Sequence, residues 1–209
     1  INGEDFVPFT EALFIKEPGI GASVAWHRDG TTHWDSPDFD EGTHGFNFMA
    51  QLYGCTAANG VWVVPGSHKE RYVDIADMVT RAGSERIEEA IPMICNPGDV
   101  VISNRQAVHG SFANTSSDWR ITINQGFHRR KSVLGVKGGG LHGKPAVYDA
   151  ERIIERSKII KLAIEARKQR FPDEQAFEYK PLSASKEDFT WNAAARKSLH
   201  DYNLLDLSI

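Results

Sequence analysis

The sequence has little cysteine, no long apolar run and no large excess of one charge. Cys55 and Cys95 are the only cysteines among 209 residues, and they form no Cys-x-x-Cys pair. Disulfide frameworks and zinc–thiolate sites use more cysteines than this, so we expect two small buried thiols. No apolar stretch approaches the roughly 20 residues that cross a bilayer, and no signal peptide is visible. We therefore expect a cytoplasmic protein with no membrane partner.

The charge balance argues against a polyanionic partner. The formal net charge is −4, with 24 basic and 28 acidic residues, which gives no general reason to expect binding to nucleic acid. A charged fraction of 25% and a hydrophobic fraction of 41% are typical of a globular protein. A chain of this length is also long enough to bury a proper core.

Short apolar segments alternate with turn residues between residue 11 and about residue 124. They are rich in Val, Ile, Phe and Trp and are bounded by Gly, Pro and Asn, as β-strands are. The expected strands are residues 13–15, 23–27, 46–53, 61–64, 99–103 and 120–126. Asn59-Gly60 predicts a hairpin or a tight turn. Many short, closely spaced strands favour a mainly β fold, a sandwich or barrel of the jelly-roll type.

Two segments interrupt this strand pattern. Residues 31–45 form a long polar stretch, and long loops of this kind inside a domain are often lids or binding loops. Residues 72–90 are helical or irregular in pattern, with Ser84 as the expected N-cap.

The C-terminal part predicts helices. Asp149 is expected to cap a helix that runs to about Arg170 and stops before Pro172. Ser185 and Asp188 resemble a capping box and predict a final helix over residues 186–200. We therefore expect a β core over residues 1–148 and a helical extension over residues 149–209 that packs on it.

The second expected strand ends in a triplet that can bind a metal, His27-Arg28-Asp29. Residues two apart on an extended strand project to the same face, so His27 and Asp29 can point at one atom. Such a pair supplies two ligands of a two-histidine-one-carboxylate triad, which holds Fe(II) and leaves adjacent positions open. The triplet alone is weak evidence, and a third ligand is required. His109 is the candidate. Arg105 shortly before it could reach the same pocket, but a surface salt bridge is the interpretation that we favour.

Arg120 opens the last expected strand. Alternation places Arg120, Thr122 and Asn124 on one face. An arginine on the inward face of a barrel is costly unless an anion meets it. A dicarboxylate held bidentately would be such an anion, with Thr122 or Ser111 adding a hydroxyl donor; a salt bridge at the strand end is the alternative. Gln51 is a further inward polar residue that could meet a cosubstrate.

These residues together resemble the phytanoyl-CoA dioxygenase family. The resemblance covers roughly residues 11–130 and rests on motifs in a set order. They are Trp-His-Arg-Asp-Gly at 26–30, Asn-Gly-Val-Trp-Val-Val-Pro-Gly-Ser-His-Lys at 59–69, Pro97-Gly98-Asp99, His109-Gly110-Ser111, Asn114 and Arg120. Members of this family are Fe(II)- and 2-oxoglutarate-dependent oxygenases on a double-stranded β-helix, a jelly-roll fold of the cupin type.

The resemblance implies specific roles. His27, Asp29 and His109 would be the iron ligands, Arg120 the clamp on the distal carboxylate of 2-oxoglutarate, and Ser111 a further cosubstrate contact. The implied reaction is the O2-dependent hydroxylation of a small-molecule substrate with release of succinate and CO2. Halogenating relatives have a small residue where Asp29 stands, so its presence favours hydroxylation.

Two other interpretations stay open. A non-catalytic, cupin-like metal-binding module would keep the ligands without turnover. A metal-dependent hydrolase or isomerase could use the same barrel, although such chemistry needs no dicarboxylate clamp. The resemblance leaves the oligomeric state open. Family members usually carry upstream helices and strands, so we expect that an N-terminal part is missing from this sequence.

Overall fold

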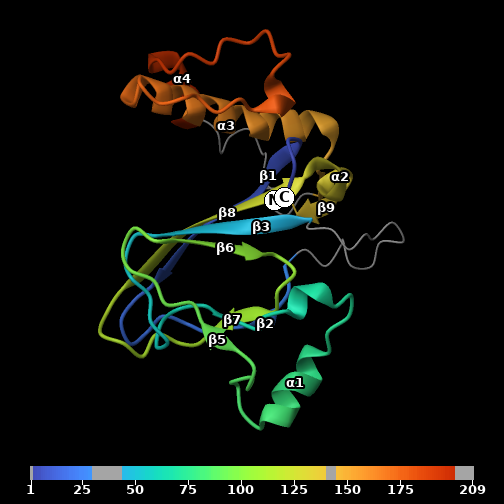
Figure 1. Cartoon of the computed structure of the whole chain (residues 1–209), viewed down its shortest axis with the longest axis vertical. Helices are drawn as coiled ribbons and strands as arrows, with labels where there is room; N and C mark the ends of the chain where they lie inside the picture. Colours follow the sequence, from blue (N-terminus) through green and yellow to red (C-terminus); the bar gives the residue numbers. More distant parts are fainter. Residues whose placement is uncertain (1, 30–43, 140–144, 201–209) are drawn as a thin grey trace. The chain divides into compact units, whose positions relative to one another are not determined.

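The computed structural model describes residues 2–29, 44–139 and 145–200. The chain divides into two compact units, one of residues 11–126 and one that joins residues 1–10 to residues 127–209. Strands dominate the first unit and helices the second (Figure 1). Within the described ranges, every helix is too short or too polar for a transmembrane segment.

The first unit is built from two sheets of four strands each. The strands are β1 Phe6–Lys16, β2 Val24–His27, β3 Gly45–Gln51, β4 Trp62–Val63, β5 Ile91–Pro92, β6 Val100–Asn104, β7 His109–Ser111 and β8 Arg120–Arg129. One sheet has the order β1-β8-β3-β6 and the other the order β2-β7-β4-β5. Apart from the pair β4 and β5, successive strands change sheet, as expected for a jelly roll. β1 and β8 also contribute residues to the second unit.

Strand alternation brings polar side chains into this barrel. In β3 and β8, buried positions alternate with more exposed ones, as the two-residue period of a strand requires. Apart from Gly45 and Gly126, the buried positions of these strands within the first unit are Asn47, Met49, Gln51, Arg120, Thr122 and Asn124. Because five of these six are polar or charged, the interior is suited to binding a polar ligand as well as to packing.

A short helix, α1 Ile75–Ala82, lies within the segment expected to be helical or irregular. The Asp74 side chain accepts a hydrogen bond from the Asp77 amide and so caps the start of the helix. Gly83, with φ 60°, ends it in the left-handed conformation that glycine adopts most easily. The prediction that Ser84 is the N-cap was therefore wrong: Ser84 follows the helix, and its hydroxyl accepts from the Arg86 amide in a turn.

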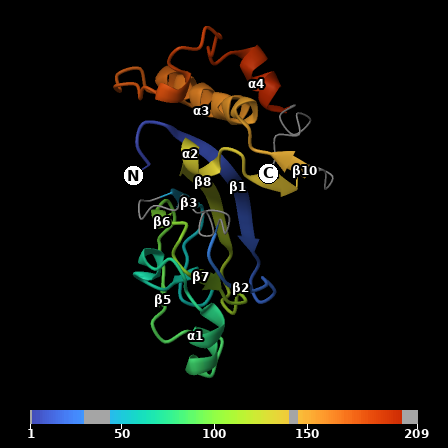
Figure 2. The same ribbon diagram turned by 90° about the vertical axis from the view of Figure 1, so that its right-hand side faces the viewer.

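The second unit contains a small β-hairpin and most of the helical residues that the structure describes. Its elements are α2 Arg130–Val133, β9 Lys137–Gly139, β10 Pro145–Val147, α3 Ala150–Arg170, η4 Lys180–Leu182 and α4 Ala193–His200. β9 and β10 pair in antiparallel fashion. α3 and α4 lie side by side (Figure 2), and Leu162 of α3 belongs to an apolar cluster with Leu199 of α4.

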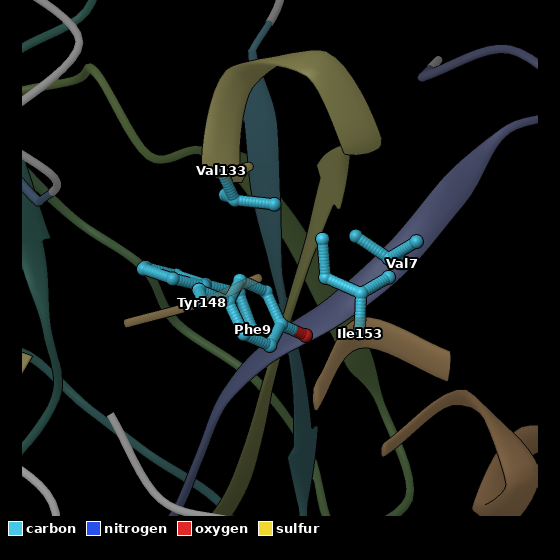
Figure 3. Packing of buried hydrophobic residues seen from close by; sticks show 5 residues of the cluster. All are labelled: Val7, Phe9, Val133, Tyr148 and Ile153. Carbon is cyan, nitrogen blue, oxygen red and sulfur yellow. The ribbon is translucent and has the colours of Figure 1, made fainter. Parts of the chain in front are cut away.

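An apolar cluster forms the core of this second unit. Its members are Val7, Phe9, Val133, Tyr148 and Ile153 (Figure 3). The rings of Phe9 and Tyr148 lie 5.3 Å apart between centroids, and the Tyr148 hydroxyl donates to the backbone carbonyl of Pro8. The phenol therefore packs as a hydrophobe while its polar end is satisfied.

The helical prediction was right for α3. The Asp149 side chain accepts from the Arg152 amide, and the helix ends at Arg170, two residues before Pro172. The division into a core of residues 1–148 and an extension of residues 149–209 stays a prediction.

The final helix begins later than predicted. Asp188 does not belong to a capping box, since its side chain accepts from the amide and the hydroxyl of Thr190 and closes a local turn. The Asn192 side chain instead accepts from the Ala195 amide at the true start of α4. Most of the predicted loop at residues 31–45 lies outside the described residues.

Candidate functional site

Three predicted ligands meet where β2 pairs with β7. His27 and His109 are directly opposite each other in the two strands, and Asp29 follows two residues after His27. The Nε2 atom of His27 lies 3.4 Å from one carboxylate oxygen of Asp29, Oδ1, and that of His109 lies 3.7 Å from the other, Oδ2. The potential ligand atoms all lie within 4.8 Å of one another, so this cluster could hold a metal ion.

Backbone carbonyls orient both imidazole rings. Nδ1 of His27 is 2.7 Å from the carbonyl oxygen of Ala25, and Nδ1 of His109 is 2.9 Å from that of Ala107. Each Nδ1 therefore carries the proton that it donates, and each Nε2 is the ring nitrogen that faces Asp29. This is the tautomer and the kind of supporting hydrogen bond that histidine ligands of metals usually have.

The charges around the cluster also suit metal binding. Burial lowers the pKa of His109 and keeps this ring neutral. The hydrogen bond with Asp29 raises the pKa of His27 against the effect of burial, so a metal ion would have to displace the proton that His27 shares with Asp29. Burial alone would raise the pKa of Asp29, but the hydrogen bond from His27 and the charge of Arg105 outweigh it and lower that pKa. Ionised carboxylate and neutral imidazole are the forms that bind metal ions.

The sequence favoured a surface salt bridge for Arg105, but the structure does not show one among the residues that it describes. Arg105 is buried, with its guanidinium Nη2 3.7 Å from Oδ2 of Asp29. The backbone explains the difference: the Arg105 amide donates to the carbonyl of Gly45, and this holds the turn after β6 against the start of β3. Asn47 was not predicted at all, although it lies at an inward position of a predicted strand.

Arg120 lies on the inner face of the barrel, as alternation predicted. It is only 3% exposed, and its Nη1 donates to the carbonyl of Asn59. Its Nε has no hydrogen-bond partner among the described residues. The alternative of a strand-end salt bridge is not supported, because no carboxylate within the described ranges pairs with Arg120.

Lys16, which sequence reasoning missed, lies close to this arginine. Its side chain is buried, and Nζ donates to the hydroxyl of Ser111 and to the carbonyl of Phe112, at 2.9 and 2.6 Å. Burial, and then the charge of Arg120, lower the pKa of Lys16 to about 8. Buried lysines are rare, so the only available signal was its place at the end of an expected strand.

The remaining predicted cosubstrate residues are also buried. Ser111 follows His109 by two residues on β7, and since its oxygen accepts from Lys16, its own hydroxyl proton can be donated elsewhere. The hydroxyl of Thr122 donates to Oε1 of Gln51 at 2.7 Å. Thr122 and Gln51 therefore satisfy one hydrogen bond between them, and the side-chain amide nitrogen of Gln51 is the group left to donate to a ligand.

Two small residues shape the turn that supports Arg120. A side chain at Gly60 would place its Cβ 2.6 Å from the carbonyl oxygen of Thr56, so only glycine fits there. The Asn59 side chain accepts from the Thr56 amide and donates to the hydroxyl of Ser116. These contacts fix the Asn59 carbonyl that receives the hydrogen bond from Arg120.

Comparison with known proteins gives a consistent picture. A family model described as phytanoyl-CoA dioxygenase matches residues 5–122. Dioxygenase lolE1 of Epichloe uncinata is 31% identical over 138 residues, which make up 65% of this chain and 47% of that protein. Phytanoyl-CoA dioxygenase 1 of Oryza sativa subsp. japonica is 30% identical over 115 residues, 51% of this chain and 39% of that protein. The chain thus spans less than half the length of these two relatives.

The fold is also found among solved structures. The crystal structure of EctD from S. alaskensis with 2-oxoglutarate and 5-hydroxyectoine matches with a TM-score of 0.52. The match covers 69% of this chain and 55% of that chain, at 22% sequence identity. It confirms the prediction of a mainly β, cupin-like fold, and α3 and α4 agree with the predicted helical C-terminal part.

Proposed function

The chain belongs to the phytanoyl-CoA dioxygenase family, and on that premise we propose that it is a non-haem Fe(II)- and 2-oxoglutarate-dependent dioxygenase. It would hydroxylate a small molecule with O2 and release succinate and CO2. One observation carries this proposal: a two-histidine-one-carboxylate cluster and a pair of buried cations occur in the same barrel. Few reactions other than 2-oxoglutarate-dependent oxidation use both.

The metal would be held by His27, Asp29 and His109. Two imidazole nitrogens and one carboxylate form the donor set that non-haem Fe(II) oxygenases use, with positions left open for other ligands. Bound Fe(II) would supply the activation of O2, which no side chain can provide. Asp29 fills the position that a halide would need, and this favours hydroxylation over halogenation.

The cosubstrate would be held by Lys16, Arg120 and Ser111. 2-Oxoglutarate carries two negative charges, and the two buried cations have no carboxylate partner among the described residues. The unpartnered Nε of Arg120 and the free hydroxyl proton of Ser111 are donors that a carboxylate would satisfy. Thr122 and Gln51 line the wall beside them.

The protein's own contribution is orientation and exclusion of water. Buried side chains close the cation end, whereas the His27 side chain is 38% exposed and that of His109 only 19%. A substrate would therefore approach the metal from the His27 side. A cytoplasmic location stays a prediction.

An anaerobic titration tests this function. Fe(II) and 2-oxoglutarate, added together to the purified protein without O2, should produce a visible metal-to-ligand charge-transfer band. The band should be absent in His109→Ala, because two ligands cannot hold the metal in the same geometry. A correctly folded protein that binds Fe(II) but gives no band would favour the non-catalytic metal-binding module instead. With O2 admitted, succinate release in the presence of substrate separates an oxygenase from a hydrolase or isomerase.

A further inference from the structure

Asp29 is held by two residues that lie outside the ligand motif. The Asn47 side-chain amide donates to Oδ2 of Asp29 at 2.7 Å. The Asn47 carbonyl oxygen in turn accepts from Nη1 of Arg105, also at 2.7 Å. Nη2 of Arg105 lies 3.7 Å from the same carboxylate oxygen. Asn47 and Arg105 are both buried, with 4% and 7% of their surface exposed.

The backbone strengthens this arrangement. Asp29 lies beyond the end of β2, where the sheet ladder no longer holds it. Its amide donates instead to the carbonyl of Arg105, and the Arg105 amide donates to the carbonyl of Gly45 beside β3. Arg105 therefore contacts Asp29 through both its backbone and its side chain. These contacts connect the ligand strand to the opposite sheet, which also carries Arg120.

The two oxygens of the carboxylate have different surroundings. Oδ2 accepts the hydrogen bond from Asn47 and faces the guanidinium of Arg105, and it also lies 3.7 Å from Nε2 of His109. Oδ1 lies 3.4 Å from Nε2 of His27. A carboxylate whose second oxygen is already hydrogen-bonded is biased toward binding a metal through the first oxygen alone.

We propose that Asn47 and Arg105 are positioning residues of the metal site, which hold Asp29 so that it offers one oxygen to the metal. Binding through one oxygen leaves one more coordination position open for cosubstrate and O2 than binding through two. This inference rests on the proposed function, since it concerns the same metal. It also explains why a buried asparagine and a buried arginine lie on the interior wall next to a ligand.

Metal affinity tests the inference without turnover. Asn47→Leu keeps most of the side-chain volume and removes the donor to Asp29. The dissociation constant for Mn(II), which unlike Fe(II) is stable in air, should rise by about 10- to 100-fold when it is measured on the apo protein without 2-oxoglutarate. This is the usual cost of losing an outer-shell partner. Arg105→Lys keeps a cation but loses the bond to Asn47, and it should raise the same constant by a smaller factor.

A matched control separates positioning from general stabilisation. Asn2 is also a buried asparagine, and its amide donates at 2.8 Å to the carbonyl of Phe127 in the second unit. Asn2→Leu should lower the melting temperature and leave the Mn(II) dissociation constant unchanged. The visible spectrum of the Co(II)-loaded protein gives a second readout: Asn47→Leu should weaken the ligand-field bands, because a second carboxylate oxygen joins the metal.

Each outcome has one meaning. If wild-type protein binds Mn(II) and both variants bind it equally well, with an unchanged Co(II) spectrum, the positioning role is wrong. If wild-type protein binds no metal, the proposed function itself fails. Should Asn47→Leu not fold, Arg105→Lys, which keeps the charge and every backbone contact, decides the question by its Mn(II) affinity.

Discussion

Two regions of the barrel, the metal end around Asp29 and the cosubstrate end around Arg120, satisfy their polar groups in different ways. At the metal end, Asp29, Asn47 and Arg105 bind one another, and both histidines are oriented by backbone carbonyls. At the cosubstrate end, Lys16 and Arg120 lie near each other, and no carboxylate among the described residues pairs with either. The first end is arranged before any ligand arrives, whereas the second carries two buried positive charges that the proposed dianionic cosubstrate would neutralise.

This difference indicates where the protein gives up stability for function. Burying two like charges without a counterion is costly, and such local costs are expected at functional sites. The metal end adds supporting contacts, whereas the proposed cosubstrate end would be relieved of its charge repulsion only when a dianion binds. Changes at the two ends should therefore have opposite effects on the stability of the ligand-free protein.

The largest effect is expected from Arg120→Met. Loss of a buried cation that pairs with a carboxylate should weaken 2-oxoglutarate binding by about 2 to 5 kcal/mol. The melting temperature of the ligand-free variant should rise, because Lys16 no longer faces a second cation. Calorimetric titration and thermal unfolding measure the two effects. Arg156→Met, which removes a buried arginine from the second unit, should leave 2-oxoglutarate affinity unchanged; a lower melting temperature in Arg120→Met would contradict the comparison.

A smaller effect should follow from the ionisation of Lys16. Burial and the charge of Arg120 lower its pKa to about 8 in the folded protein, from an ordinary value of 10.5. Well below pH 8, Lys16 is protonated in both the folded and the unfolded protein. Between pH 8 and 10.5 the unfolded protein binds more protons at Lys16 than the folded protein does. The free energy of unfolding of the ligand-free protein should therefore rise with pH over this range. Affinity for 2-oxoglutarate should fall over the same range as the cation is lost. The pH dependence of stability and that of 2-oxoglutarate affinity should both be weaker in Lys16→Met. Identical pH profiles in the wild-type protein and the variant would show that Lys16 does not bind the cosubstrate.

The smallest effect is expected from a substitution in α1, outside the two regions compared. Asp74→Ala removes the N-cap of α1 and should cost about 1 kcal/mol of unfolding free energy. Asp74 belongs neither to the metal end nor to the cosubstrate end, so binding of Mn(II) and of 2-oxoglutarate should be unchanged. Chemical denaturation and calorimetry check both statements, and a change in either affinity would mean that α1 influences the site.

The same contrast explains what the sequence could predict. The metal cluster is encoded in part locally, since His27 ends β2 and Asp29 follows two residues later. The inward position of Arg120 follows from strand alternation. Lys16, Asn47 and their contacts depend on how distant strands pair, which no single sequence window contains. Side chains that form local turns set where the helices begin. Asp188 closes a turn with Thr190, and α4 begins only after this turn.

The comparison of two 2-oxo acids tests the central claim most directly. 2-Oxobutyrate has the same metal-binding head as 2-oxoglutarate but lacks the distal carboxylate that Lys16 and Arg120 would hold. Anaerobic titration of the Fe(II)-loaded protein, followed by the charge-transfer band, should show a strong preference of wild-type protein for 2-oxoglutarate and a loss of this preference in Arg120→Met. Equal affinity of wild-type protein for both acids, or an unchanged preference in the variant, would contradict the account.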